Sequence, residues 1–220
     1  MSSRGIARQL ATAACDAGAP LSWFETLYSQ ADGDHSTVPW ADMSVNPNLA
    51  DWLSTHDFPT PGGSALVVGC GLGDDAEELA RLGLKVTAFD ISPTCIAWCK
   101  RRFPDSAVQY LRADLFDAPA AWTRAFDFVF EAYTLQVLPP ELRKSAIRHI
   151  ANFVGSAGTL LVITRARDEA DDRGLMPWPL LRTELDRFVE HGLKEEHVED
   201  FVEAEDPPVR RFRAVYKRHA

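Results

Sequence analysis

The sequence predicts a doubly wound α/β fold, in which helices cover both faces of a mostly parallel sheet. Three observations support this prediction. Apolar runs of strand length alternate with segments of helical length, a glycine-rich turn joins the first apolar run to a helix, and an alternating strand pair ends the chain. Sheets of this kind bind their ligands beyond the carboxyl ends of the strands, where the strand order reverses.

The N-terminal segment predicts helices that cap this sheet domain. Apolar side chains recur at helical spacing at 6–14, and further apolar stretches follow at 23–28 and 49–53. Aromatic residues at such spacing either pack a cap against the core or line a pocket for a ligand. Trp23 and Tyr28 are the candidates for a substrate pocket in this segment.

A glycine-rich turn, GCGLG at 69–73, follows the apolar run 65–68 and precedes a helix that opens with Asp74 and Asp75. Its glycines allow a tight turn and a close approach of the backbone to a ligand. A dinucleotide fingerprint reads G-x-G-x-x-G and holds a pyrophosphate at the helix N-terminus. Here Asp74 takes the place of the third glycine, and two carboxylates oppose a pyrophosphate. The motif favours a nucleoside ligand with an ammonium group and no phosphate, the alternative being a simple strand-to-helix turn.

Acidic residues stand at the carboxyl ends of three predicted strands. Asp90 ends the second strand, Asp114 follows the third and Glu131 follows the fourth. A carboxylate in the position of Asp90 can accept hydrogen bonds from both hydroxyls of a ribose. Asp114 can accept a hydrogen bond from the amine of an adenine, with Ile91 and Leu115 covering the faces of the ring. These residues predict a nucleoside site at one edge of the sheet.

Strands and helices alternate strictly from the glycine-rich turn to the fifth strand. Ser92 and Pro93 mark the start of one helix, as N-cap and first helical residue. Beyond the fifth strand the pattern changes to a helix near 178–191 and then to an alternating pair, 197–202 and 211–217, that predicts an antiparallel hairpin. The strands of the alternating part are predicted at 65–68, 85–90, 108–112, 126–130 and 158–164, and its later helices at 93–103 and 140–153.

Together these motifs resemble those of the class I S-adenosylmethionine-dependent methyltransferases. The resemblance depends on VVGCGLGDD at 67–75, FDIS at 89–92, RADLF at 112–116, FDFVFE at 126–131 and the terminal strand pair. It implies a Rossmann-like sheet of seven strands, S-adenosylmethionine as cofactor and S-adenosylhomocysteine as product. The cofactor-binding residues that it implies are Gly69, Cys70 and Gly71 for the methionine part, Asp90 for the ribose, and Ile91, Asp114 and Leu115 for the adenine. Glu131 is expected to face the cofactor as well.

A narrower similarity links the chain to the thiopurine and thiol methyltransferase group. It depends on the glycine motif, on Pro39-Trp40, on the run 46–53 and on the late segment 175–180. The similarity implies that Trp40 packs near the cofactor. The chain has Trp40-Ala-Asp-Met where that group has Trp-Asp-x-Gly-Arg, so the class of methyl acceptor stays open.

For methyl transfer from a sulfonium, the protein mainly has to position the acceptor in line with the methyl group and to exclude water. A general base is needed only where the nucleophile is neutral at working pH. Tyr133, just after the fourth strand, is the candidate catalytic residue, either orienting the acceptor or taking part in proton transfer, and otherwise lining the pocket wall. Met176 and Trp178, in the long loop 166–179, would give an acceptor pocket an apolar and aromatic wall. His35 is interpreted as a solvated loop histidine.

The composition is typical of one soluble catalytic domain. The chain has 220 residues, of which 46% are hydrophobic, and we expect a helical cap at 1–58 on a methyltransferase core at 59–220. No apolar run approaches the roughly 20 residues that span a bilayer, and the N-terminus lacks the pattern of a secretion signal. A cytoplasmic protein without a membrane partner is expected.

Charge and cysteine content exclude further classes of function. A net charge of −9 opposes binding to nucleic acid through phosphate neutralisation, and the basic run 210–218 is expected to solvate the last strand. The four cysteines do not form a disulfide framework, and Cys95 and Cys99 share a helical face that we expect in the core. The six histidines form no cluster with metal-ligand spacing, so no metal is predicted.

The predicted function is methyl transfer to sulfur or oxygen of a small apolar or aromatic acceptor, with sulfur narrowly ahead. Two alternatives remain open. A non-catalytic S-adenosylmethionine-binding module would keep the glycines and acids but have a plugged acceptor pocket. A nicotinamide-dependent oxidoreductase on a related fold is disfavoured by Asp74 and by the final hairpin. Nothing in the sequence indicates the oligomeric state.

Overall fold

The computed structural model describes residues 2–56 and 62–219, and its seven strands form one mixed sheet. The strand order is β3-β2-β1-β4-β5-β7-β6. The pairs β2/β3, β1/β4 and β4/β5 are parallel, whereas β7 is antiparallel to both β5 and β6. This sheet, with helices preceding it in the chain, confirms the predicted fold class. The chain divides into two compact units, which are described separately.

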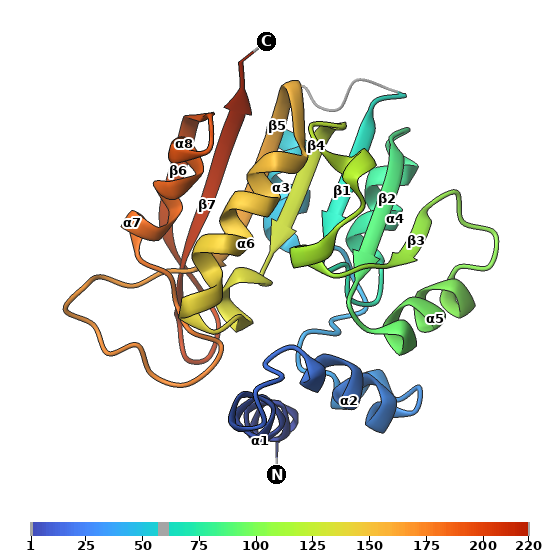
Figure 1. Cartoon of the computed structure of the whole chain (residues 1–220), viewed down its shortest axis with the longest axis vertical. Coiled ribbons are helices and arrows are strands. Elements are labelled where there is room, and N and C mark those ends of the chain that lie inside the picture. The colour runs from blue at the N-terminus through green and yellow to red at the C-terminus, as the bar shows by residue number, and fades with distance from the viewer. Residues whose placement is uncertain (1, 57–61, 220) are drawn as a thin grey trace. The chain divides into compact units, whose positions relative to one another are not determined.

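The first unit contains the residues up to 63 together with Gly69–Asp114. Its helices α1 and α2, blue in Figure 1, pack side by side. The predicted start of α5 is confirmed, because the Ser92 hydroxyl accepts a hydrogen bond from the amide of Cys95 (3.0 Å) and Pro93 is the first helical residue. Its elements are α1 (Ser3–Asp16), α2 (Ser22–Ala31), η1 (His35–Thr37), α3 (Pro47–Thr55), α4 (Asp74–Arg81), β2 (Lys85–Asp90), α5 (Pro93–Arg102) and β3 (Gln109–Arg112). The predicted boundary between residues 58 and 59 lies outside the described residues.

The second unit contains Ser64–Val68 together with the residues from 115 onward. Figure 1 shows α6 lying across one face of β4 and β5. In the register of β1 and β4, Val68 lies beside Glu131, so the carboxyl ends of these two strands are neighbours. Its elements are β1 (Ser64–Val68), η2 (Leu115–Asp117), η3 (Ala120–Trp122), β4 (Phe126–Ala132), η4 (Leu135–Val137), α6 (Pro140–Phe153), β5 (Val154–Arg165), α7 (Arg182–Leu185), α8 (Arg187–Glu190), β6 (Leu193–Glu203) and β7 (Val209–Arg218).

The prediction of a helix near 178–191 is wrong for its first turn. The amide of Leu180 donates to the carbonyl of Arg165 (2.9 Å), and the amide of Arg167 donates to the carbonyl of Leu180 (3.0 Å). This bridge holds the chain extended, and helical structure begins only at Arg182. None of the helices in the described part of the chain could span a bilayer.

Gly73 shows why the third glycine of the motif is needed. It is the N-cap of α4, with a φ of 94°. A Cβ atom built on it would lie 2.5 Å from the Tyr110 hydroxyl and 3.1 Å from the edge of that ring. Both the backbone conformation and the packing against β3 exclude a side chain at this position.

Candidate functional site

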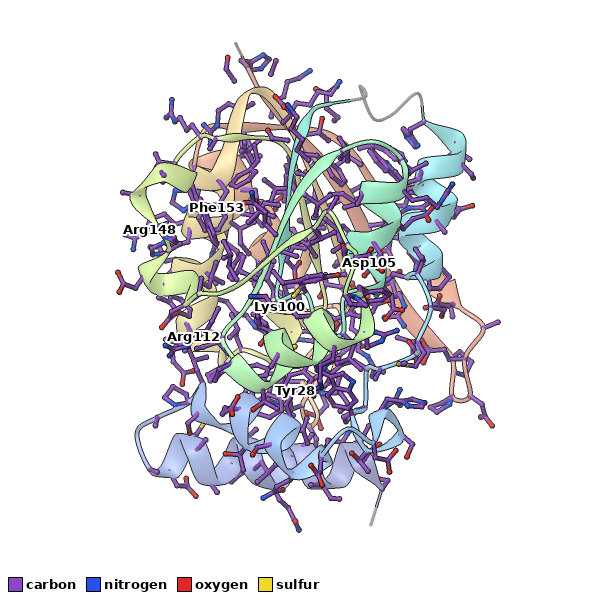
Figure 2. The ribbon with its side chains drawn as sticks, turned by 90° about the vertical axis from the view of Figure 1, so that its right-hand side faces the viewer. Tyr28, Lys100, Asp105, Arg112, Arg148 and Phe153 are labelled. Carbon is purple, nitrogen blue, oxygen red and sulfur yellow. The ribbon has the colours of Figure 1, made fainter. Side chains whose placement is uncertain are left out.

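The loop Gly69–Gly73 leads into α4, and all three of its glycines have positive φ. The amide of Cys70 donates to the carbonyl of Phe89 (2.9 Å), which fixes the loop to the end of β2. Trp40 and Tyr28 lie over Gly71, at 3.7 and 3.8 Å from the position that a Cβ atom would take. The indole N–H of Trp40 donates to the Tyr28 hydroxyl (2.8 Å). The N-terminal segment therefore encloses the glycine loop, and Figure 2 shows Tyr28 between α2 and α5.

Asp90 lies buried at the carboxyl end of β2. Burial raises the pKa of its carboxyl group from 3.8 to about 6, although the amides of Ser92 (2.9 Å) and Gly71 donate to it. A carboxylate has about four lone-pair positions, so these two amides and the Cys95 thiol, which is also within hydrogen-bond reach, still leave a position for a hydroxyl. The amide of Ala113 donates to the carbonyl of Asp90 (3.1 Å). This bond brings Asp114 to the same end of the β2/β3 pair as Asp90 and Ile91.

The acids at the start of α4 are less available than the sequence indicates. Asp74 forms a two-pronged ion pair with Arg102 of α5, with both N···O distances 2.8 Å. Asp75 accepts a hydrogen bond from the amide of Asn46 (2.7 Å), and burial raises its pKa to about 6. Asp74 therefore does not oppose a pyrophosphate as predicted, because Arg102 compensates its charge. Asp75 keeps the first turn of α4 unfavourable for a phosphate.

Three thiols converge on one carbonyl oxygen beneath this loop. The Sγ atoms of Cys95, Cys99 and Cys70 lie 2.8, 3.1 and 3.7 Å from the oxygen of Gly71. Burial raises the pKa of the Cys95 thiol. The expected core location of Cys95 and Cys99 is confirmed, and their thiols also orient the Gly71 peptide. Within the described ranges, no three His, Cys, Asp or Glu side chains are arranged to hold a metal ion.

Glu25 of α2 connects the N-terminal helices to the residues that follow Asp90. Its carboxylate accepts hydrogen bonds from the hydroxyls of Ser92 (2.5 Å) and Thr94 (2.6 Å) and from the amide of Thr94 (3.2 Å). Burial raises the pKa of Glu25, but these hydrogen bonds and the charge of Arg112 outweigh it and lower the pKa below 4.5. No local sequence pattern reveals this contact, because Ser92 and Thr94 lie 67 and 69 residues from Glu25 in the sequence.

Replacing Glu25 by glutamine is expected to destabilise the protein by about 1–2 kcal/mol at pH 7, because charge-assisted hydrogen bonds are lost at a partly solvated site. The lowered pKa means that this stabilisation is present above pH 4.5 and disappears as the pH falls through the folded-state value. Urea denaturation of the two proteins at pH 7 and at pH 4 tests this, with Asp105→Asn as the exposed control. A difference that persists unchanged at low pH would contradict the assignment.

In the second unit, Glu131 is a fully buried carboxyl group at the end of β4. Its Oε1 accepts hydrogen bonds from the amides of Thr134 (2.8 Å) and Leu135 (3.0 Å), while Oε2 has no hydrogen-bond partner among the described residues. Burial raises its pKa to about 7, against the opposing effect of the two amides. Since Glu131 lies beside Val68 in the sheet, it stands next to the strand end from which Gly69 continues.

Tyr133 follows with a φ of 68°, and its amide donates to the carbonyl of Ile163 (3.0 Å). The guanidinium carbon of Arg211 lies 4.8 Å from the centre of the Tyr133 ring. The sequence pattern did not predict Arg211 as a site residue, since its strand is 78 positions away and reads as a solvated edge.

A buried arginine joins the segment after Tyr133 to the long loop. Arg143, only 1% exposed, donates to the carbonyls of Leu135 (3.1 Å) and Trp178 (2.9 Å) and forms an ion pair with Glu184 (3.1 Å). The amide of Trp178 also donates to the carbonyl of Gln136 (2.7 Å). The backbone of Trp178 is therefore held against Gln136, three residues after Tyr133 in the sequence.

The predicted site residues are divided between the two units. Those gathered around the glycine loop and the ends of β2 and β3 in the first unit are Tyr28, Trp40, Gly69, Cys70, Gly71, Asp90, Ile91 and Asp114. Those in the second unit are Leu115, Glu131, Tyr133, Met176 and Trp178. Trp23 is buried in the first unit, stacked on Phe24 (4.0 Å) and edge-on to Trp40 (5.9 Å), and His35 is exposed in η1.

Residues 65–158 match the family model of a methyltransferase domain. Over 129 residues the chain is 33% identical to the ubiquinone biosynthesis O-methyltransferase of Xanthomonas campestris pv. campestris (strain B100), an alignment that covers 58% of this chain and 53% of that protein. The enzyme of the same name from Xanthomonas oryzae pv. oryzae (strain PXO99A) is 32% identical over the same length. The chain thus spans about half the length of the curated relatives that it matches.

Solved structures show the same fold at low sequence identity. The TehB-like S-adenosylmethionine-dependent methyltransferase from Corynebacterium glutamicum ATCC 13032 Kitasato has a TM-score of 0.64 at 20% identity, over 89% of this chain and 98% of that chain. The [4+2]-cyclase SpnF has a TM-score of 0.71 at 17% identity, over 90% and 94% of the two chains. A shared fold does not determine the reaction.

Proposed function

Because residues 65–158 match a methyltransferase domain, we propose that this protein is a class I methyltransferase that transfers the methyl group of S-adenosylmethionine to an oxygen atom of a small apolar or aromatic molecule. The observation that carries the proposal is the arrangement of the first unit. The glycine loop lies against the end of β2, where a buried carboxylate, Asp90, keeps a free lone pair.

The residues of the first unit fit this cofactor. Asp90 accepts hydrogen bonds from the ribose hydroxyls, Asp114 accepts one from the adenine amine, and Ile91 packs on the ring. The backbone at 69–71 holds the methionine part, and the Trp40 side chain packs against this loop at Gly71. In the second unit, Glu131 is buried with one oxygen that has no hydrogen-bond partner among the described residues, and its expected role toward the cofactor stays a prediction. Asp75, at the start of α4, disfavours a pyrophosphate at that helix end.

Bound S-adenosylmethionine supplies a methyl group on a sulfonium, which is already activated for transfer. The chain's own contribution is to hold the acceptor oxygen in line with that methyl group and to exclude water. Tyr133 orients the acceptor, and Met176 and Trp178 form the wall against which an apolar or aromatic acceptor packs. Within the first unit, Trp23 and Tyr28 pack against Trp40, and their role in an acceptor pocket stays a prediction.

Oxygen is proposed as the nucleophile because the curated relatives carry the name O-methyltransferase. The narrower similarity to the thiopurine and thiol methyltransferase group stays a prediction. Transfer to sulfur is the competing outcome, since a thiol ionises more readily and needs less help from a base.

The function is tested by measuring S-adenosylhomocysteine release over matched phenols, catechols and thiols, with cofactor binding measured by calorimetry on the same protein sample. We expect micromolar or tighter cofactor binding and turnover of one or more phenolic acceptors. Turnover of thiols alone would overturn the choice of oxygen. Tight binding without turnover of any acceptor would support a non-catalytic binding module, and binding of NAD instead would support an oxidoreductase.

A further inference from the structure

Three cysteines of the first unit, Cys70 of the glycine loop and Cys95 and Cys99 of α5, form what we call the thiol cluster. Their sulfur atoms surround the carbonyl oxygen of Gly71. Each thiol is also within hydrogen-bonding reach of the other two. A carbonyl oxygen has two lone pairs, so three thiol protons cannot all be donated to it at once. The cluster therefore also contains hydrogen bonds from sulfur to sulfur.

Cys99 is the most acidic thiol of the cluster. Hydrogen bonds from Cys70 and Cys95 lower the pKa of its thiol, as does the charge of Arg102, although burial opposes this. Burial raises the pKa of Cys95. A hydrogen bond from Cys95 lowers the pKa of Cys70, but its own bond to Cys99 and its burial raise that pKa overall. The cluster therefore loses its first proton from Cys99, and a thiolate is the form of cysteine that attacks other sulfur atoms.

The cluster reaches the surface at Cys70. This residue is 8% exposed, whereas Cys95 and Cys99 are fully buried. Cys70 belongs to the loop between two glycines of positive φ and not to a helix, so its sulfur can follow a new bond through a change in loop conformation. A small oxidant such as hydrogen peroxide therefore meets Cys70 first, with the thiolate of Cys99 behind it.

We propose that the thiol cluster is a site of reversible oxidation, at which hydrogen peroxide joins Cys70 to Cys99 in a disulfide that weakens cofactor binding. The formation of the disulfide is independent of the proposed function, and its effect on the cofactor rests on that function.

The disulfide forms in two steps. The sulfur of Cys70 attacks one peroxide oxygen, and the O–O bond breaks with its electron pair on the departing hydroxide. The thiol proton of Cys70 passes through the Cys99 thiolate to this hydroxide and gives water, leaving Cys70 as a sulfenic acid. The Cys99 thiolate then attacks the sulfur of Cys70, the S–O bond breaks, and the second hydroxide takes a proton from solvent. Each cysteine is oxidised by one electron, and the peroxide is reduced by two.

The disulfide acts on the proposed cofactor site through Gly71. The Gly71 amide donates to Asp90, while its carbonyl lies among the three thiols, so this one peptide joins the cluster to the carboxylate proposed for the ribose. In the disulfide, neither Cys70 nor Cys99 has a proton to donate, and a sulfur–sulfur bond of about 2 Å draws the loop toward α5. Binding of S-adenosylhomocysteine should therefore weaken by about 10–100-fold, a common size for coupling between two sites.

The first test needs no cofactor. Cys15, exposed in α1, is replaced by serine in every sample to prevent bonds between molecules. After treatment with hydrogen peroxide, mass spectrometry of unreduced peptides should show a bond between Cys70 and Cys99 that dithiothreitol reverses. Cys99→Ser should slow the loss of the Cys70 thiol about tenfold or more, because the base and attacking thiolate is gone. Cys95→Ser is the matched control from the same helix and should still form the bond.

Three results of this test would overturn the proposal. They are thiols that stay reduced in the folded protein under conditions that oxidise the unfolded chain, a bond between Cys95 and Cys99 in place of the proposed one, and oxidation that dithiothreitol does not reverse.

The second test measures the coupling to the cofactor. Titration calorimetry with S-adenosylhomocysteine should give the expected loss of affinity in the oxidised protein, and peroxide treatment should leave the affinity of Cys70→Ser unchanged. Bound S-adenosylhomocysteine should in turn oppose disulfide formation in glutathione buffers by the same factor, because coupling is reciprocal. Equal affinity of the oxidised and reduced proteins would overturn the coupling. Failure of the proposed function would instead appear as absence of S-adenosylhomocysteine binding in the reduced protein, with the disulfide of the first test still formed.

Discussion

Replacing Asp90 by asparagine is expected to weaken binding of S-adenosylhomocysteine by about 10–100-fold. The substitution keeps the shape of the side chain but replaces charge-assisted hydrogen bonds to the ribose hydroxyls by neutral ones, a loss of about 1–3 kcal/mol, and 1.4 kcal/mol corresponds to a factor of ten. Titration calorimetry at pH 8 measures this change directly.

The pH dependence of binding distinguishes Asp90 from other residues. Burial raises its pKa to about 6, so the carboxylate that accepts the hydroxyls is present above that pH and becomes protonated below it. Affinity of the wild-type protein should therefore fall as the pH decreases below 6, and this fall should be absent in Asp90→Asn. Asp75→Asn is the matched control, since Asp75 is another buried acid with a pKa of about 6 that faces Asn46 rather than the ligand. Equal loss of affinity in both variants would contradict the ribose assignment.

Replacing Arg143 by methionine is expected to destabilise the protein by about 3–5 kcal/mol. The side chain is almost fully buried, and its loss leaves Glu184 without its ion-pair partner and the carbonyls of Leu135 and Trp178 without this donor. Removing one partner of a buried ion pair costs this much because the remaining charge stays buried without compensation. Urea denaturation at pH 7 measures the change in the free energy of unfolding.

Arg148→Met is the control, because Arg148 is on the same helix but exposed, with one hydrogen bond to Ser145. Figure 2 shows Arg148 at the outer side of its helix. It should change stability by less than about 0.5 kcal/mol. A loss below about 1 kcal/mol in Arg143→Met would mean that water replaces the missing donor. If the acceptor site depends on the Trp178 segment, KM for the acceptor should also rise in Arg143→Met.

Local patterns predicted most of the fold. Ser92 and Pro93 begin α5 as predicted, because an N-cap and a first-turn proline act within a few residues of each other. The apolar runs form the parallel strands, and the alternating run 211–217 forms part of β7. Both were predictable because the spacing of apolar residues indicates whether one or both faces of a strand are buried. The helix near 178–191 was wrong at its start, since a backbone bridge from Leu180 to β5 overrides local preference.

The candidate site was predicted less completely, for a related reason. Asp90 and the glycines belong to one continuous segment, so their proximity follows from a strand, a turn and a helix. The partners of the other key residues are remote in the chain: Glu25 meets Ser92 67 residues away, and Arg143 meets Glu184 41 residues away. Pairs at such separation leave no local pattern that a single sequence can display.

The sequence by itself determined the doubly wound sheet, the glycine loop, the acids at the strand ends and hence the class of ligand, because each depends on backbone conformation and spacing within one short segment. Only the tertiary structure decided that Asp74 is neutralised by Arg102, that three thiols orient the Gly71 carbonyl, and that Arg211 lies over Tyr133. Most of these contacts join residues of different elements, and their charges and hydrogen bonds take effect only when packing brings the elements within a few ångströms.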